Sequence, residues 1–424
     1  MSGHATCRGD RAGREEGRGG VRVAEQDITL GRLLAAVEER PPVESVAVIA
    51  RVLGEDLGAS DVGFLLADFG GDAIWRLPTF LSPEAGRQGR IELPGTVYDR
   101  VIRSQRPQTV DSPEEGCVRV YTPVANRGDV MGVLEVCVAE QPDDGQMRHM
   151  AQAALALAYV VTTSRRFTDM YEWGRRIVSP TLAAEIQQNL LPDTLCCEAG
   201  NVTVAAALEP ALTIAGDTFD YSLDRDTLHL SITDAMGHDT GAALLATLVV
   251  GALRNTRRAR ATLAEQALAA HHALLEHGDG GTVTGQIMRV DLASGRCLFV
   301  NAGHPWPLRR HEGRVAEVHP AVDLPFGAPH QDAYRVQHLD LAPGDRLVLL
   351  TDGMLERSAS ELDLPALIER DSGLHPREAV RSLTRELREI TGGDLRDDAT
   401  VICLDWYGTE LPAPVAAARA EGTA

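Results

Sequence analysis

The sequence contains no lysine, so all 41 positions that hold lysine or arginine are arginines. The many Ala, Arg and Gly residues indicate that this bias comes from a GC-rich coding sequence. A phosphate-binding P-loop, a protein-kinase site and a pyridoxal Schiff base each require a lysine. The composition therefore excludes these three kinds of site.

Long hydrophobic runs are also missing. The longest candidate, residues 242–253, is shorter than the roughly 20 residues that span a bilayer. The N-terminal segment has arginines but lacks the apolar core of a signal peptide. A formal net charge of −20 disfavours binding to nucleic acid or to an acidic membrane surface. We expect a cytoplasmic protein that binds neither nucleic acid nor membrane.

The seven cysteines are odd in number and lack metal-ligand spacing. Cys196 and Cys197 are adjacent, which suits neither an ordinary disulfide nor a zinc knuckle. We expect all seven cysteines to be reduced thiols, with redox sensing by Cys196 and Cys197 as the alternative.

The length of 424 residues predicts two or three domains, at roughly 150 residues each. Residues 1–27 are rich in Gly, Arg and Glu and are expected to be disordered. The patterns then divide the chain into a sheet-and-helix domain at 28–165, a helical linker at 166–195, a second domain at 196–408 and a flexible tail at 409–424. The predicted fold class is α+β.

Two hairpins are predicted in the first domain. Strand-like runs at 62–69 and 73–77 flank the turn Gly70-Gly71-Asp72, and runs at 117–124 and 130–138 flank residues 126–129. The second hairpin resembles the end of a GAF domain, and this resemblance covers roughly residues 28–165. It implies a GAF-like domain that is either a ligand sensor or a structural and dimerisation module. No chromophore, haem or metal signature is present.

Residues 147–191 have a helical pattern almost throughout. Ser179-Pro180 resembles an N-cap followed by proline at the first helical position, and Pro192 ends the helix that it starts. A homodimer formed through the GAF-like domain and this linker is one expected assembly. The linker is either a signalling connector or a spacer.

Four aspartates stand at the edges of strand-like runs in the second domain: Asp217, Asp234, Asp352 and Asp397. Asp217 and Asp234 lie symmetrically about the turn 224–227, which places them opposite one another in a regular hairpin. Cβ atoms of such a pair are about 4.5–5.5 Å apart, close enough for two carboxylates to share a metal ion. Without a cation, one of the two would have to stay protonated.

The other two aspartates also lie at strand ends. Asp352 follows the apolar run 347–350, and Gly353 lets the chain turn sharply after it. Asp397 and Asp398 immediately precede the strand-like run 399–404. Such carboxylates repel one another unless a cation lies among them, so the sequence predicts a divalent-metal site with hydrolytic chemistry.

The neighbours of these aspartates resemble the motifs of the PPM-type (protein phosphatase 2C-like) metal-dependent protein phosphatases. The branch is the one typified by the sporulation phosphatase SpoIIE, and the resemblance spans about residues 181–406. The matching segments are Gln187–Pro192, Ile214–Tyr221, Asp234–His238, Asn301–Pro305, Thr351–Glu356 and Asp397–Thr400.

This resemblance implies an αββα sandwich with two divalent metal ions, Mn²⁺ or Mg²⁺. A water made nucleophilic by the cations would attack the phosphorus of a phosphoserine or phosphothreonine. The resemblance also implies these ligands: Asp217 and Asp234 as shared ligands, the backbone carbonyl of Ala235, Asp352, Asp397, and Asp398 either outer-sphere or exchanging roles with Asp397.

Two histidines belong to the same motifs. His238 is the candidate proton donor to the leaving oxygen, and His304 is a weaker candidate. For both, the alternative is a packed structural histidine. The chain departs from the family pattern at Ala215, where a glycine is usual, and at Asp239, which we expect to cap the following helix rather than to bind a further metal.

The leading hypothesis is a protein-serine/threonine phosphatase regulated by its GAF-like domain. The resemblance implies a phosphorylated anti-sigma-factor antagonist as its substrate. The alternative is a non-catalytic signalling scaffold that binds a partner through a phosphatase-like domain. A weaker alternative is a phosphatase of small phosphate esters.

Overall fold

The computed structural model describes residues 30–68, 70–77, 89–173, 181–210, 216–237, 239–355, 362–392, 395 and 397–409. The segment 1–27, expected to be disordered, lies outside this range, as does nearly all of the tail at 409–424. No helix within the described ranges combines the length and the hydropathy needed to cross a bilayer.

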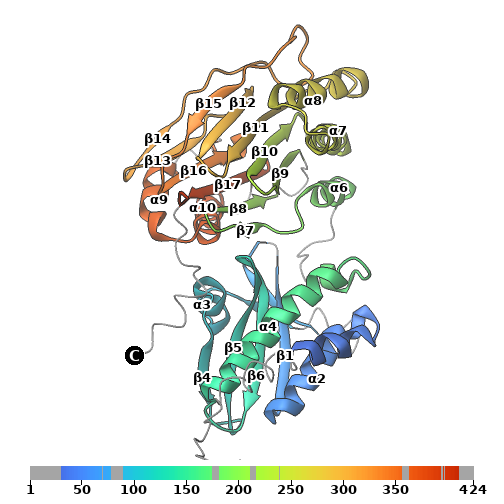
Figure 1. The fold of residues 1–424 in the computed structure, drawn as a ribbon, viewed down its shortest axis with the longest axis vertical. Coiled ribbons are helices and arrows are strands. Elements are labelled where there is room, and N and C mark those ends of the chain that lie inside the picture. The colour runs from blue at the N-terminus through green and yellow to red at the C-terminus, as the bar shows by residue number, and fades with distance from the viewer. Residues whose placement is uncertain are drawn as a thin grey trace, which may run out of the picture.

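The N-terminal part of the chain forms one six-stranded antiparallel sheet (Figure 1). Its spatial order is β3-β2-β1-β6-β5-β4. The strands are β1 (Asp61–Ala67), β2 (Ala73–Arg76), β3 (Arg90–Glu92), β4 (Gln108–Ser112), β5 (Cys117–Asn126) and β6 (Asp129–Val138). Both hairpins predicted from the sequence, β1–β2 and β5–β6, are confirmed.

Helices cover both faces of this sheet, because apolar side chains point to both faces along strands such as β1. Phe64 and Leu66 pack with α2 (Ser45–Leu57) and α4 (Asp144–Ser164) on one face. Leu65 and Ala67 pack with α3 (Val97–Ser104) on the other. Residues 30–38 are also helical, followed by the short η1 (Pro42–Glu44).

The connector is less continuous than its sequence pattern indicated. Helix α4 ends at Ser164, and α5 (Met170–Trp173) follows after a turn. Helix α6 (Leu182–Leu190) begins after Thr181, whose hydroxyl accepts a hydrogen bond from the backbone N–H of Ala184. Ser179 and Pro180 lie outside the described residues, and Thr181 is the N-cap that the sequence reading missed.

The C-terminal part contains two antiparallel sheets. The five-stranded sheet has the order β15-β12-β11-β10-β9, and the six-stranded sheet has the order β14-β13-β16-β17-β8-β7. The strands are β7 (Cys196–Glu198), β8 (Val202–Glu209), β9 (Asp217–Leu223), β10 (Thr227–Ala235), β11 (Val283–Asp291), β12 (Arg296–Ala302), β13 (Leu308–His311), β14 (Arg314–Glu317), β15 (Gln337–Asp340), β16 (Asp345–Leu350) and β17 (Ala399–Trp406).

These two sheets face one another between two pairs of helices (Figure 1). Side chains such as Phe219, Met288 and Leu349 fill the space between the sheets. Helices α7 (Thr240–Arg258) and α8 (Leu263–His277) cover the outer face of the first sheet. Helices α9 (Leu364–Arg370) and α10 (Pro376–Thr391) cover that of the second, with short turns η3 (Asp352–Met354) and η5 (Asp371–Gly373) beside them. The layers are α-β-β-α, and strand ends from both sheets meet at one edge.

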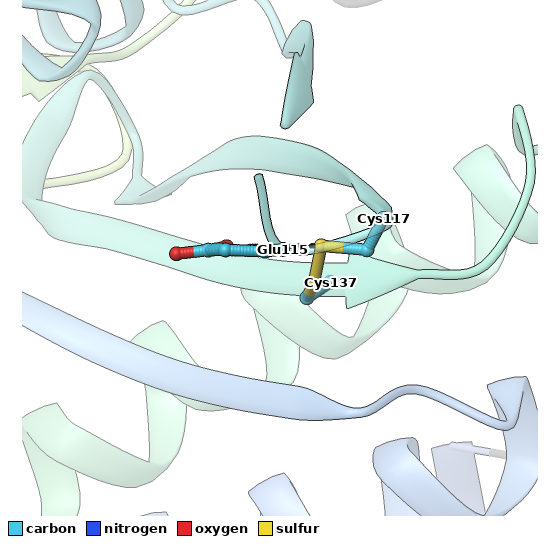
Figure 2. A group of neighbouring side chains, drawn as sticks. All are labelled: Glu115, Cys117 and Cys137. Carbon is cyan, nitrogen blue, oxygen red and sulfur yellow. Dashed lines mark hydrogen bonds between the residues drawn. A yellow bond between two sulfur atoms is a disulfide. The ribbon is translucent and has the colours of Figure 1, made fainter. Parts of the chain in front are cut away.

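One expectation about cysteine is wrong. Cys117 and Cys137 form a disulfide between β5 and β6, with their Cα atoms 5.9 Å apart (Figure 2). The two residues are 20 positions apart in the sequence, and only the pairing of the strands brings them within disulfide range.

The adjacent pair Cys196 and Cys197 is present as free thiols. Burial raises the pKa of both thiols, so both stay protonated at neutral pH. A protonated, buried thiol is a poor nucleophile, and this argues against the alternative that the pair senses redox state.

Candidate metal centre

The β9–β10 hairpin places Asp217 directly opposite Asp234, as the symmetry of its turn predicted. Close contacts hold this register at the end of the hairpin away from its turn. The hydroxyls of Thr218 and Thr233 lie 2.5 Å apart on the adjoining pair, and a Cβ at Gly216 would lie 2.6 Å from the carbonyl oxygen of Ala235. Glycine at 216 is therefore required for the hairpin to close beneath the two carboxylates.

Asp217 joins the two sheets. Its Oδ2 accepts hydrogen bonds of 2.7 Å from the hydroxyls of Thr351 and Thr400. Thr351 follows β16 and Thr400 lies in β17, and the Thr400 N–H donates to the Thr351 hydroxyl at 2.8 Å. Two hydroxyls from the β16 and β17 ends therefore hold the carboxylate at the start of β9, although the three segments lie far apart in the sequence.

Asp352 reaches the same edge through a close backbone approach. It opens η3 directly after β16, and a Cβ at Gly353 would lie 2.0 Å from the carbonyl oxygen of Asp398. Only glycine lets the turn at 352–354 lie against the Asp397-Asp398 turn. Asp352 is exposed, Asp397 is half-buried and Asp398 is buried.

Gln187 in α6 is a site residue whose role the sequence analysis did not identify. Its side chain is buried, and Nε2 donates to the backbone oxygen of Asp217 at 2.8 Å and to Oδ2 of Asp398 at 2.6 Å. The Gln187–Pro192 motif pointed to this segment, but the spacing of residues in the sequence did not predict that Gln187 contacts the aspartates. Tertiary structure places this linker helix directly against the carboxylates.

The aspartates influence one another's protonation. Burial raises the pKa of Asp217 well above its usual range, and the carboxylates of Asp234 and Asp398 raise it further, against the hydrogen bonds from Thr400 and Thr351. Burial raises the pKa of Asp234 to about 7, with Asp352, Asp397 and Asp398 acting in the same direction. None of these perturbing groups is a cation. Such crowded oxygen ligands fit a divalent metal, which relieves the repulsion among them.

A different group in the N-terminal sheet brings potential ligands closer together. In the described part of the chain, only Glu115, Cys117 and Cys137 form a trio whose ligand atoms all lie within 4.8 Å of one another (Figure 2). The two sulfur atoms are bonded to each other, and Arg119 forms an ion pair with Glu115 at 2.5 Å. This trio therefore has little ligand capacity while the disulfide is intact.

His304 is held in place by several hydrogen bonds. It is buried, its Nδ1 lies 2.9 Å from the hydroxyl of Thr284, and its backbone is bracketed by the Asn301 side chain, which accepts from His304 N and donates to His304 O. Burial lowers the pKa of His304 to about 3, so the ring is uncharged at pH 7 and is a poor general acid. The other candidate, His238, lies outside the described residues.

Asp239 caps α7, as expected. Its Oδ1 accepts from the backbone N–H of Gly241 at 2.7 Å. The departure from the family pattern at this position is therefore accommodated as an N-cap. Ala215, the other departure, lies outside the described residues.

Residues 224–407 match the family model of stage II sporulation protein E (SpoIIE). The match includes Asp234, Asp352, Asp397 and Asp398, whereas Asp217 and Gln187 precede it.

Two curated relatives come from Bacillus subtilis. Phosphoserine phosphatase RsbP is 25% identical over 185 residues, which cover 42% of this chain and 45% of RsbP. Phosphoserine phosphatase RsbU is 23% identical over 230 residues, which cover 53% of this chain and 68% of RsbU. Among solved structures, the SiaA-PP2C domain of Pseudomonas aeruginosa aligns with a TM-score of 0.45 and 22% identity, over 52% of this chain and 92% of that domain. The chain thus spans about half the length of RsbP.

Proposed function

We propose that the protein is a metal-dependent protein-serine/threonine phosphatase. The observation that carries this proposal is that Asp217 and Asp234 face one another, and that burial together with the neighbouring carboxylates of Asp352, Asp397 and Asp398 raises the pKa values of this pair. The names of RsbP and RsbU as phosphoserine phosphatases support it.

Two divalent ions, Mn²⁺ or Mg²⁺, would be held by these carboxylates. Asp217 and Asp234 would share ions, the carbonyl of Ala235 would add a ligand, and Asp352 and Asp397 would complete the shell. The hydrogen bond from Gln187 to Asp398 Oδ2 favours an outer-sphere role for that oxygen. Bound divalent ions supply positive charge that polarises a phosphoryl group and lowers the pKa of water.

The chain's own groups orient the site. Thr351 and Thr400 fix one oxygen of Asp217 through two hydrogen bonds, which leaves the other oxygen, Oδ1, for a cation. His238 remains the candidate for donating a proton to the leaving serine or threonine oxygen. His304 is too strongly buried and too weakly basic for that step.

A direct assay tests the proposal. Mn²⁺-dependent hydrolysis of p-nitrophenyl phosphate and of a phosphoserine peptide is expected, and Asp352→Asn abolishes both. The matched control is Asp226→Asn in the exposed β9–β10 turn, which keeps full activity. Hydrolysis that survives in Asp352→Asn, or that needs no divalent ion, contradicts the metal assignment. Partner binding without hydrolysis by the unmodified protein would support the scaffold alternative.

We also propose that the N-terminal domain, GAF-like in its final hairpin, regulates the site. Arg377 of α10 is buried and donates to the carbonyl oxygens of Gly128 at 2.7 Å and Ile102 at 3.4 Å in that domain. Arg388 of α10 contacts Asp72 of the same domain. Helix α10 packs on β8 and on β17, the strand that follows Asp398, so a displacement of the domain would bear on that strand.

The linker offers a second route to the site through Gln187. Gln187→Leu is expected to lower kcat about 10–100-fold, as loss of a partner to a metal-binding carboxylate commonly does. Asn189→Ala, on the exposed face of the same helix, is the control and leaves kcat unchanged. Equal activity of Gln187→Leu and the unmodified protein would exclude this route.

The proposed substrate is a phosphorylated anti-sigma-factor antagonist, and the proposed assembly is a homodimer through the GAF-like domain and linker. The first proposal is tested by incubating the protein with a phosphorylated antagonist purified from cells that express this protein, and by measuring loss of the phosphate with mass spectrometry. Light scattering of the full chain tests the second. A strictly monomeric protein, or an antagonist that keeps its phosphate, refutes the corresponding proposal.

A further inference from the structure

A cavity of about 410 Å³ opens beside two of the carboxylates. Asp234 and Asp352, two residues of the proposed metal site, line it. The lining also includes Trp306, Glu317, Val322 and Leu355. Three of these, Trp306, Val322 and Leu355, are large apolar side chains that are 43%, 41% and 48% exposed.

A rigid turn presents Trp306. Gln286 of β11 donates to the carbonyl oxygen of Pro305, and Asn301 holds the backbone of His304 from both sides. The indole packs edge-on against the ring of His319, with centroids 4.2 Å apart. The buried, neutral His304 thus anchors a turn whose exposed end carries an aromatic ring into the cavity.

The wall that carries Val322 is fixed to the same turn. The Asp323 N–H donates to the carbonyl oxygen of Asn301 at 2.9 Å. Arg335 donates to Oδ1 of Asp323 and to the carbonyl oxygen of Val322, both at 2.7 Å. Because this backbone is held by an ion pair and a β-bridge, Val322 remains exposed in a prearranged position.

Leu355 places the third apolar group beside the metal-binding residues. Its backbone N–H donates to the carbonyl oxygen of Asp352 at 2.7 Å, so its position follows that of the carboxylate residue. Apolar surface that a fold keeps exposed and prearranged next to a reaction centre is characteristic of binding sites.

We propose that Trp306, with Val322 and Leu355, forms a specificity pocket for an apolar side chain that flanks the phosphorylated serine or threonine of a protein substrate. This inference rests on the proposed phosphatase function. The cavity is continuous with Asp234 and Asp352, so its occupant belongs to the substrate that places its phosphate there. Glu317 on the lining repels acidic residues, so the flanking segment is apolar and free of Asp and Glu.

Paired phosphoserine peptides of equal length and charge test the pocket. One peptide carries leucine beside the phosphoserine on both sides, and the other carries glycine there. The full-length protein with Mn²⁺ is expected to hydrolyse the leucine peptide with a kcat/KM about tenfold higher, equivalent to about 1.4 kcal/mol. A third peptide with aspartate at the same positions is expected to be the poorest substrate.

The variant Trp306→Ala is expected to reduce the leucine-over-glycine ratio to near one, and Trp306→Phe is expected to retain most of it. Leu275→Ala, which removes an exposed apolar side chain from α8, away from the cavity lining, is the control and keeps the ratio. An unchanged ratio in Trp306→Ala, or a ratio near one in the unmodified protein, overturns the pocket while hydrolysis of the peptides upholds the phosphatase. Absence of hydrolysis of every substrate by the unmodified protein overturns the proposed function itself, and the pocket with it.

Discussion

Two buried carboxylates, Glu135 in the N-terminal part and Asp217 in the C-terminal part, are balanced in opposite ways. In the N-terminal sheet, Glu135 is buried and receives hydrogen bonds from Arg76 at 2.9 Å and from Arg119 at 2.6 Å. In the C-terminal part, Asp217 is equally buried, but its side chain is bonded to two threonine hydroxyls and faces Asp234.

Glu135 and Asp217 differ in what offsets the cost of burying a carboxylate. Around Glu135, the cations needed to offset burial are built into neighbouring strands. Around Asp217, burial and neighbouring carboxylates act together to raise the pKa, and the proposed metal ions would supply the counter-charge.

The largest expected effect is on catalysis. Asp234→Asn removes one charge from the shared position of the proposed metal site and is expected to lower kcat/KM by about 10³-fold. Steady-state hydrolysis of a phosphoserine peptide with saturating Mn²⁺ measures it. Circular dichroism of the variant checks that the fold is retained, and activity within about twofold of the unmodified protein would contradict the assignment.

Glu135→Gln is expected to show the reverse pattern, with a loss of stability as its main effect. The substitution removes the buried charge that Arg76 and Arg119 share, while each keeps a more exposed carboxylate partner, so it is expected to cost about 1–3 kcal/mol. Urea unfolding of the full chain measures the loss. Glu115→Gln, at an exposed ion pair with Arg119, is the control and is expected to cost at most about 1 kcal/mol.

Addition of Mn²⁺ is expected to stabilise the C-terminal part selectively. A metal present at 100 times its dissociation constant adds about 2.7 kcal/mol to the free energy of unfolding. Hydrogen exchange of the full chain, with and without Mn²⁺, is expected to show added protection at the ends of β9, β10 and β17 rather than at β6. Equal protection of β6, or stabilisation that persists in Asp234→Asn, would break the comparison.

Glu209 at the end of β8 is an intermediate case. It forms an ion pair with Arg388 at 3.2 Å, but Arg388 also contacts Asp72. Burial raises the pKa of Glu209 to about 7, and Asp72 and Asp68 raise it further, while Arg388 lowers it. One arginine shared between carboxylates therefore does not offset the burial.

The sign of its pH effect follows from that shift. Glu209 ionises near pH 4.5 when unfolded and near 7 when folded, so it lowers stability as the pH rises through this window. Glu209→Gln is expected to be up to about 2 kcal/mol more stable than the unmodified protein at pH 8, with the difference vanishing at pH 4. Chemical unfolding at several pH values measures this, and a pH-independent difference would contradict it.

The sequence predicted much of the local structure because its signals were local. The turn 224–227 lies at the centre of the β9–β10 hairpin, so counting residues was enough to place Asp217 opposite Asp234. The turn at Gly70–Asp72 predicted the β1–β2 hairpin in the same way. Asp239 before an Ala/Leu-rich run was recognisable as an N-cap from side-chain chemistry alone.

Contacts between segments distant in sequence escaped prediction. Gln187 lies 211 positions from Asp398, and nothing in its spacing indicated the hydrogen bond between them. The Cys117–Cys137 disulfide depends on the β5–β6 pairing, which overrode the expectation of reduced thiols. The environment of His304 was equally hidden, because burial and not residue type gives that ring its low pKa.

The sequence by itself determined which residue types are available: five carboxylates at strand ends, no lysine among them, and glycines where the chain turns. Tertiary structure decided which of these groups meet, because sheet packing brings β9, β10, β16 and β17 to one edge. It also decided which buried carboxylates have a cation and which do not. The ionisable group is a property of each residue, whereas its pKa depends on the solvation and the neighbours that the fold provides.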